Sequence, residues 1–219
     1  MIRILPLIVA ILPFAGITAA YSLNTDAGVL PSCIPYLEGC TSISATGRYP
    51  PGSLVFRAAL LPQAGLLLVF WWLAYEWLRQ TRPASAGFRR GVFLAGLIGA
   101  IALIVYVTFL GSKIPFYEFM RRFGIYFYFG GIAVAQIMLT IALRPSRLRS
   151  SMLLVIAMPF VLGITNLLLK QFIAEFDRFE NTIEWLAALL MQIWFVLFYF
   201  VWRETGVTLT VRKDSTSAR

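Results

Sequence analysis

Two serines and a set of arginines near the ends of the apolar stretches are the side chains best suited to bind a phosphate. They are Ser42, Ser44, Arg48 and Arg57 and, as weaker candidates, Arg121 and Arg122. Arginine presents a planar fork of donors that matches phosphate geometry, and serine hydroxyls add further hydrogen bonds. In the alternative interpretation, the serines satisfy backbone amides in turns and the arginines extend along the membrane surface. The pattern therefore indicates a lipid-headgroup site, with a structural role as the competing interpretation.

Gln136, Asn166 and Gln192 are polar side chains inside the apolar stretches, and Lys170 directly follows the fifth stretch. Asn166 and Lys170 are four residues apart, so they share one face of a helix. Polar groups inside a membrane usually face other helices and find partners there, and an ionisable group is a candidate for function. Lys170 lies near the end of its apolar stretch, where its ammonium group can instead reach the membrane surface.

The sequence contains no histidine. A Ser-His-Asp triad, a histidine-ligated metal and a histidine proton relay are therefore excluded. Several carboxylates can act as acids or bases, although acids in loops are usually solvated. They are Glu38, Glu118, Glu175, Asp177, Glu180 and Glu184. No nucleophile–base pair is recognisable from the sequence, so we predict no metal and no cofactor, and we leave direct catalysis open.

The composition is that of an integral membrane protein rather than a soluble domain. Of 219 residues, 59% are hydrophobic and 13% are charged, and the mean hydropathy is +0.79. The apolar stretches approach the length of about 20 residues that is needed to cross a bilayer. The net charge of +9 does not indicate nucleic-acid binding, because the cations lie in short segments between the apolar stretches.

Six apolar stretches predict six transmembrane helices and therefore an all-α bundle. Their approximate bounds are 4–21, 58–78, 92–110, 123–143, 152–169 and 183–202. The first stretch has an alternative interpretation as a cleavable signal peptide, because Thr18-Ala19-Ala20 resembles a cleavage site. Its length and its prolines, Pro6 and Pro13, favour a retained helix. We expect one membrane domain over residues 1–203 and a polar cytosolic tail over residues 204–219.

Two further patterns predict how the helices pack. The third stretch contains Gly96 and Gly99 with small neighbours, which allows close approach of helix backbones in lipid. We expect this small face to pack within the chain rather than to form a dimer interface. The second stretch is rich in aromatic residues near its far end, namely Trp71, Trp72, Tyr75 and Trp77, and we interpret these as part of an aromatic belt at the membrane interface.

Six spans place both termini on one side of the membrane, and the charges of the connecting segments indicate which side. The side of the termini has twelve cations and three acids, whereas the opposite side has seven of each. The positive-inside rule therefore predicts cytosolic termini. The first outer loop then lies in an oxidising compartment, where we expect Cys33 and Cys40 to form a disulfide.

The segment around these cysteines contains a distinctive series of residues: Cys33, Tyr36-Leu37, Ser-Ile-Ser before Gly47, Pro50-Pro51 and Phe56-Arg57. This series resembles the first non-cytosolic loop of the Frag/DRAM/Sfk family of membrane proteins. That family includes the eukaryotic post-GPI-attachment remodelling factor and the amino-terminal part of the Cwh-type cell-wall proteins. The resemblance implies a six-span protein associated with membrane lipids. Its eukaryotic members are associated with fatty-acid remodelling of GPI anchors, which implies acyl transfer as the reaction of an enzymatic member.

These observations together predict an integral membrane protein that handles or regulates lipids in the non-cytosolic leaflet. The expected location is a bacterial inner membrane or a eukaryotic endomembrane or plasma membrane. Membrane lipids are the expected ligands, and no nucleic acid is expected as a partner. The alternative function is an accessory subunit that packs against a larger membrane protein complex. A non-catalytic role is favoured, with acyl transfer as the enzymatic alternative.

Overall fold

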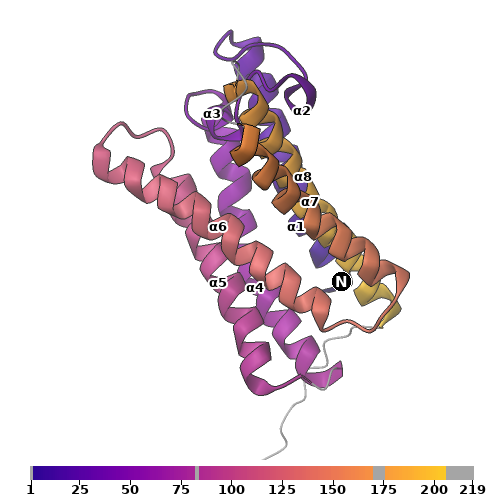
Figure 1. Cartoon of the computed structure of the whole chain (residues 1–219). Helices are drawn as coiled ribbons and strands as arrows, with labels where there is room; N and C mark the ends of the chain where they lie inside the picture. Colours follow the sequence, from indigo (N-terminus) through magenta and orange to yellow (C-terminus); the bar gives the residue numbers. More distant parts are fainter. Residues whose placement is uncertain (1, 82–83, 170–175, 206–219) are drawn as a thin grey trace, which may run out of the picture.

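The structure is a computed structural model that describes residues 2–81, 84–169 and 176–205. Six of its helices are long and apolar enough to cross a membrane (Figure 1). They are α1 (Leu5–Asp26), α4 (Gly52–Thr81), α5 (Ala86–Phe109), α6 (Pro115–Ile141), α7 (Arg147–Leu169) and α8 (Phe176–Glu204). A short 3-10 helix (Ile2–Ile4) precedes α1, and two single-turn helices, α2 (Pro35–Glu38) and α3 (Ile43–Thr46), lie between α1 and α4. The predicted six-helix, all-α architecture is confirmed.

Each predicted apolar stretch corresponds to one long helix, but several helices begin earlier than predicted. Helix α4 begins at Gly52 rather than at residue 58, and α8 begins at Phe176 rather than at residue 183. Hydropathy detects only the apolar part of a helix. Polar residues in a first turn, such as Ser53 and Asp177, lower the hydropathy without preventing helix formation.

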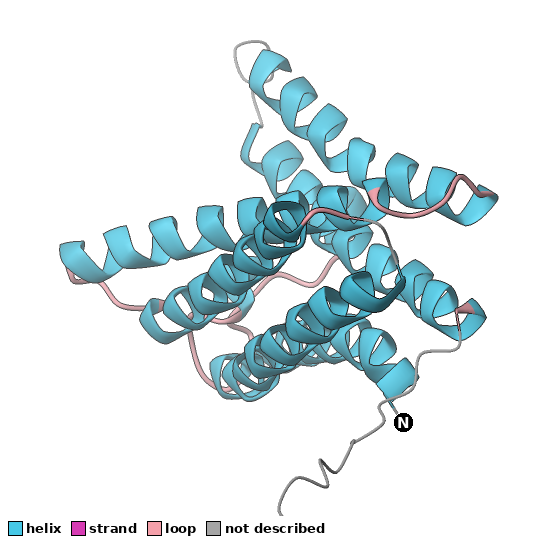
Figure 2. Cartoon of the chain, turned by 90° about the horizontal axis from the view of Figure 1, so that it is seen from below, coloured by secondary structure: helices cyan, strands magenta, loops and turns pink. Residues whose placement is uncertain are grey.

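The helices pack in a defined order around α4. Helix α1 contacts α4 and α8, α4 contacts α5, α5 contacts α6, and α7 contacts α8. The α5–α6 hairpin leans away from the α7–α8 pair toward the end of the molecule that carries α2 and α3 (Figure 1). The view turned by 90° shows the helices crossing at angles rather than running parallel (Figure 2). Helices α1 and α4 therefore pack closely against each other, whereas α6 and α7 contact each other over a much shorter length.

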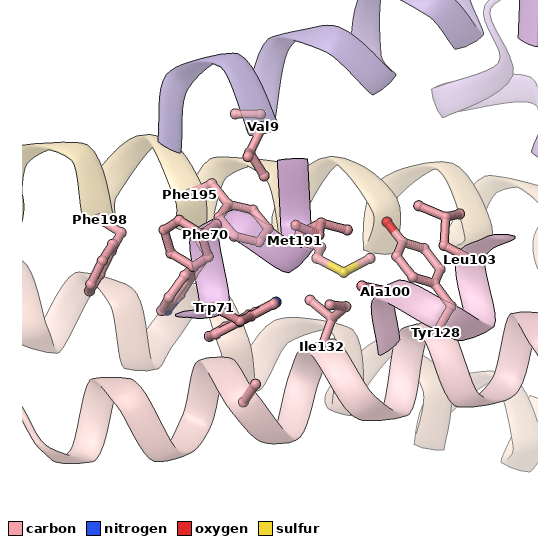
Figure 3. Close-up of a cluster of buried hydrophobic side chains, with 14 of the residues drawn as sticks. Val9, Phe70, Trp71, Ala100, Leu103, Tyr128, Ile132, Met191, Phe195 and Phe198 are labelled. Carbon is pink, nitrogen blue, oxygen red and sulfur yellow. The ribbon is translucent and has the colours of Figure 1, made fainter. Parts of the chain in front are cut away.

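Aromatic rings from α4 and α8 form a cluster in the core (Figure 3). Phe70 contacts Trp71, Phe195 and Phe198 edge to face, with ring centroids 4.9, 5.1 and 5.5 Å apart. Each such pair contributes about 0.5–1.5 kcal/mol beyond the area that it buries. Trp71 and Trp77 are 0% and 5% exposed. For Trp71 and Trp77 the interpretation as an interfacial belt is therefore wrong, because both side chains are buried inside the bundle. Trp72 is 50% exposed and Tyr75 is half-buried, so the structure does not contradict the interpretation for these two.

Small residues allow α5 and α6 to pack closely along most of their length. A Cβ atom added at Gly99 would lie 2.8 Å from the Ile132 side chain, and one added at Gly131 would lie 2.8 Å from the backbone of Gly99. Gly96 faces the ring of Trp71, where a side chain has no room. The small face of the third span therefore packs within the chain, as expected from the sequence.

The segment between α1 and α4, residues 27–51, folds over one end of the bundle and is called the cap segment. The predicted disulfide between Cys33 and Cys40 is confirmed, with Cα atoms 6.5 Å apart. It encloses α2, and Gly39, the residue that follows this helix, has a φ of 57°. Glycine adopts this left-handed conformation without steric cost. The disulfide and this turn together form a compact unit on the end of the bundle.

Candidate functional site

Side chains from the first turns of α8 hold the cap segment in place. Asn181 Nδ2 donates to the carbonyl of Gly39 and Trp185 Nε1 donates to the carbonyl of Thr41, each at 2.9 Å. The two α8 residues are four apart and therefore share one face of the helix. The indole also contacts the ring of Tyr36 edge to face, with centroids 5.1 Å apart. Partial burial raises the pKa of the Tyr36 phenol, so this side chain stays neutral at physiological pH.

Helix α1 holds the cap segment from the other side. The backbone N–H of Cys33 donates to the Tyr21 hydroxyl at 2.9 Å. The buried amide of Asn24 donates to the carbonyl of Thr46 at 3.0 Å and accepts from the N–H of Gly52 at 2.9 Å. A buried amide with both its donor and its acceptor satisfied strongly restricts the backbone around it. The position of α3 is thus set by α1 as well as by α8.

Within the cap segment, the two serines of the Ser-Ile-Ser triplet have different roles. Ser42 Oγ accepts from the N–H of Ala45 at 3.2 Å and caps the first turn of α3. Ser44 Oγ lies 3.0 Å from the hydroxyl of Tyr106 on α5 and donates to Glu184 Oε1 on α8 at 3.5 Å. Ser44, Tyr106 and Glu184 are called the hydroxyl–carboxylate cluster. It joins the cap segment to two helices that are remote from it in the sequence.

A cavity of about 560 Å³ lies between α6, α7 and α8 and is called the α6–α8 cavity. Its walls are mainly apolar and include Phe129, Ala133, Val155, Ile156, Phe160 and Met191. Ser44, Glu180 and Glu184 line its cap end, and Gln136 lines its opposite end. From Glu180 to Met191, α8 follows the cavity for about 16 Å at about 1.5 Å per residue. The cavity is therefore elongated, apolar along its length and acidic at the cap end.

The carboxylate of Glu184 is half-buried at this end of the cavity. Burying a charge is costly unless other groups compensate for the lost water. The positive charge of Arg48 acts on Glu184, and the backbone amides of Ile43 and Ser44 face the carboxyl. Arg48 and Arg121 both act through space on Tyr106. Two cations thus act electrostatically on the hydroxyl–carboxylate cluster.

A sequence profile of the Frag1/DRAM/Sfk1/Cwh43P N-terminal domain matches residues 1–205, which include all six candidate membrane helices and the cap segment. The chain belongs to this family. Neither the curated proteins nor the solved structures compared with the chain gave a match. The family resemblance seen in the cap segment is therefore confirmed and extends far beyond that segment.

In this Frag1-family protein, the arginines predicted to bind a headgroup have different surroundings. Arg57 Nη2 donates to the carbonyl of Leu110 at 2.8 Å, directly after the last residue of α5. Arg48 is exposed and Arg121 is half-buried, and both act on the hydroxyl–carboxylate cluster. Arg122 is exposed on α6. The structure thus brings Arg48 and Arg121 toward one site, gives Arg57 a structural contact, and leaves headgroup binding as a prediction.

The polar residues predicted inside the membrane lie at separate places in this Frag1-family fold. Gln136 is 3% exposed, lines the α6–α8 cavity and donates from Nε2 to the carbonyl of Met191 at 3.2 Å. Gln192 is 8% exposed and lies on α8. Asn166 is half-buried on α7, and Lys170 lies outside the described residues. Of these four predictions, Gln136 is the one that the structure connects to the cavity.

Nothing in the sequence distinguished Tyr106 from other aromatic residues or assigned Glu184 a role distinct from that of the other acids. Tyr106 lies in an apolar stretch like any core aromatic residue, and its hydroxyl partner is 62 residues away. Glu184 did offer a signal, because it lies inside the sixth apolar stretch, where an acid is unusual. The buried Gln63, which donates to the carbonyl of Val9 at 2.8 Å, was also missed.

Proposed function

We propose that this Frag1-family protein binds a membrane lipid, with an acyl chain in the α6–α8 cavity and the polar headgroup at the cap end. The observation that carries the proposal is the polarity of the cavity. Its walls along the membrane helices are apolar, whereas Ser44, Glu180 and Glu184 gather at the cap end. Its volume of about 560 Å³ lies in the range of about 300–1,000 Å³ that is typical of small-molecule sites. A ligand with one long apolar part and one polar end matches this distribution.

The charge distribution of the connecting segments supports binding from the non-cytosolic leaflet. Cations are concentrated on the side of the termini, which the positive-inside rule assigns to the cytosol. The cap segment and its disulfide then lie on the opposite side, in an oxidising compartment. The polar end of the α6–α8 cavity is at the cap end, so the headgroup belongs to the non-cytosolic leaflet.

The flanking arginines supply the phosphate contacts in this proposal. The positive charges of Arg48 and Arg121 act on the hydroxyl–carboxylate cluster, which lies at the polar end of the cavity. A guanidinium group binds a phosphate through two parallel hydrogen bonds. Arg57 and Arg122 are further candidates for a phosphate contact, and Ser44 offers a hydroxyl from within the cavity. Ser42 caps α3 and contributes indirectly, by positioning Ser44.

A second candidate function, an accessory subunit of a larger membrane complex, is favoured by the exposure of α7. The side chains of Leu154, Val161 and Leu167 are 64%, 61% and 72% exposed. Such a surface fits a partner helix as well as it fits lipid tails. The two functions differ in what remains bound to the protein after gentle extraction from the membrane.

Native mass spectrometry of the gently solubilised full chain tests the proposal. We expect phospholipid to be bound in a near one-to-one ratio. Ala133→Trp on α6 fills the cavity with an indole and should remove this lipid. Val134→Trp is the matched control, because Val134 is the next residue of the same helix and is 48% exposed. Retention of lipid by Ala133→Trp contradicts the proposed site, and a stoichiometric protein in place of lipid supports the accessory-subunit function.

A further inference from the structure

A hydroxyl group and a carboxylate lie together at the polar end of the α6–α8 cavity. Ser44 Oγ is 3.5 Å from Glu184 Oε1, and both residues line the cavity. In this arrangement, a lipid whose chain occupies the cavity brings its acyl ester linkage to the same end. The nucleophile, a base and the ester carbonyl then meet at one place, which is the geometric requirement for acyl transfer.

The hydrogen bonds around Ser44 are consistent with an activated hydroxyl group. The Ser44 hydroxyl donates to Glu184 Oε1, so its O–H points to the carboxyl group. The Tyr106 hydroxyl, 3.0 Å away, then donates to Ser44 Oγ. Tyr106 is 3% exposed and packs edge to face against Phe56, so its hydroxyl is fixed in place. One lone pair of Ser44 Oγ remains free for attack on a carbonyl carbon.

The cap segment does not depend on this cluster for its attachment to α8. Asn181 and Trp185 already hold the cap with two hydrogen bonds of 2.9 Å each. Of the neighbouring hydroxyl groups, that of Ser42 caps α3 and that of Thr46 donates to the carbonyl of Ile43 at 2.7 Å. Ser44 is the hydroxyl that combines a carboxylate partner with a position on the cavity wall.

We infer that Ser44 is the nucleophile and Glu184 the general base of an acyl-transfer reaction on a lipid ester bound in the α6–α8 cavity, with Tyr106 as a positioning residue. This inference rests on the proposed function, because the ester is that of the lipid in the cavity. Ser44 Oγ bonds to the acyl carbon while Glu184 takes the hydroxyl proton. The bond from the acyl carbon to the leaving oxygen breaks, and Glu184 passes the proton to that oxygen, which leaves a lipid alcohol.

The second half of the reaction restores the site. Water, or a hydroxyl group of a second lipid, attacks the acyl-serine while Glu184 takes its proton. The bond between the acyl carbon and Ser44 Oγ breaks, and Glu184 returns the proton to Ser44. The products are a free fatty acid when water attacks and a newly acylated lipid when a lipid hydroxyl attacks. No redox partner is required, and atoms and charges balance in both halves.

The test uses the full chain reconstituted in phospholipid vesicles that contain a phospholipid with an isotopically labelled acyl chain and a lysophospholipid as acceptor. We expect labelled fatty acid or newly acylated lysophospholipid to form. We also expect a long-chain alkyl fluorophosphonate to label Ser44, as located by peptide mass spectrometry. Ser44→Ala and Glu184→Gln should lower turnover by at least about 100-fold, the usual effect of removing acid–base catalysis. Tyr106→Phe should lower kcat with little change in KM, and Ser85→Ala, which removes the side-chain cap at the start of α5, should keep most of the turnover.

The controls separate catalysis from folding and from lipid binding. Each variant must retain the Cys33–Cys40 disulfide and its bound phospholipid. Ser44→Cys keeps a nucleophile of similar size and should accumulate an acyl-thioester, which serves as the second variant if Ser44→Ala misfolds. Turnover by Ser44→Ala at the parental rate overturns the inference. So does the absence of both turnover and labelling in the parent protein with lipid bound, a result that leaves the proposed lipid-binding function intact.

Discussion

Trp185 donates a 2.9 Å hydrogen bond from its indole N–H to the carbonyl of Thr41, a residue 144 positions earlier in the chain. Thr41 directly follows Cys40, so the bond holds the cap segment at the point where the disulfide closes. Trp185 also neighbours Glu184 on α8. Thr41 and Ser44 both belong to the cap segment, and Trp185 and Glu184 both belong to α8. The hydrogen bond from Trp185 to Thr41 therefore also sets the position of Ser44 relative to Glu184.

Trp185→Phe should destabilise the protein by about 1–3 kcal/mol, the cost of leaving a buried polar group unpaired. The carbonyl that loses its donor belongs to Thr41, which is 5% exposed. The measurement is the thermal unfolding midpoint in detergent. Trp72→Phe is the matched control, since Trp72 is 50% exposed on α4. Equal shifts for the two variants would show that the bond to the cap contributes nothing specific.

The disulfide should contribute about 2–3 kcal/mol to stability on the chain-entropy estimate, because it closes a short loop. Alkylation of the unreduced, denatured protein should modify neither Cys33 nor Cys40, and alkylation after reduction should modify both. Cys33→Ser with Cys40→Ser should lower the unfolding midpoint and weaken the protection of the cap segment against proteolysis. Full alkylation without prior reduction is the outcome that excludes the bond.

Gly39→Ala should be more harmful than Gly28→Ala, although both glycines have a positive φ, 57° and 69°. Alanine in this conformation costs about 1–2 kcal/mol at either position. A Cβ atom at Gly39 also collides with the backbone of Arg178 on α8, whereas the space around Gly28 is open. We expect a measurably lower unfolding midpoint and weaker cap docking for Gly39→Ala. If both variants unfold at the same temperature, the result contradicts the close contact between Gly39 and α8.

The six-helix bundle could be predicted from the sequence because its cause is local. A stretch of about 20 apolar residues needs a helix to satisfy its backbone in lipid, wherever the rest of the chain lies. The disulfide was also predictable, since Cys33 and Cys40 are the two cysteines of the chain and are only seven residues apart. The first residues of α4 and α8 could not be predicted, because residues such as Ser53 are polar and nevertheless belong to the helix.

The hydroxyl–carboxylate cluster could not be predicted because it depends on tertiary packing. Ser44 meets Tyr106 and Glu184 across 62 and 140 residues of sequence. Neither partner stands at a fixed offset from Ser44 in any short motif. The same limit applies to Arg57, whose contact with Leu110 crosses 53 residues. The arginine and serine side chains near the cap segment predicted phosphate binding from the sequence. Which of these residues contact one another depends on the fold.

Topology gives a further prediction. A carboxy-terminal reporter should be protected from membrane-impermeant reagents in intact cells, and a tag inserted at Gly28 should be labelled. The reason is the excess of cations on the side of the termini, which retains those segments in the cytosol. Permeabilised cells serve as the control, because both tags should then react. Labelling of the carboxy-terminal reporter in intact cells contradicts this orientation.

Arg57 allows a structural contact to be separated from a headgroup contact. Its Nη2 donates to the carbonyl of Leu110, and a single donor is enough for that bond. A lysine ammonium can supply one such donor, but it cannot reproduce the planar pair of donors that holds a phosphate. Arg57→Lys should therefore keep the fold and the disulfide.

If Arg57 binds a lipid phosphate, Arg57→Lys should also lose bound phospholipid in native mass spectrometry, and Arg48→Lys should have the same effect. Arg203→Lys, in the last turn of α8 far from the cap end, is the matched control and should retain lipid. Retention of lipid by both Arg57→Lys and Arg48→Lys would leave Arg57 with its structural bond alone.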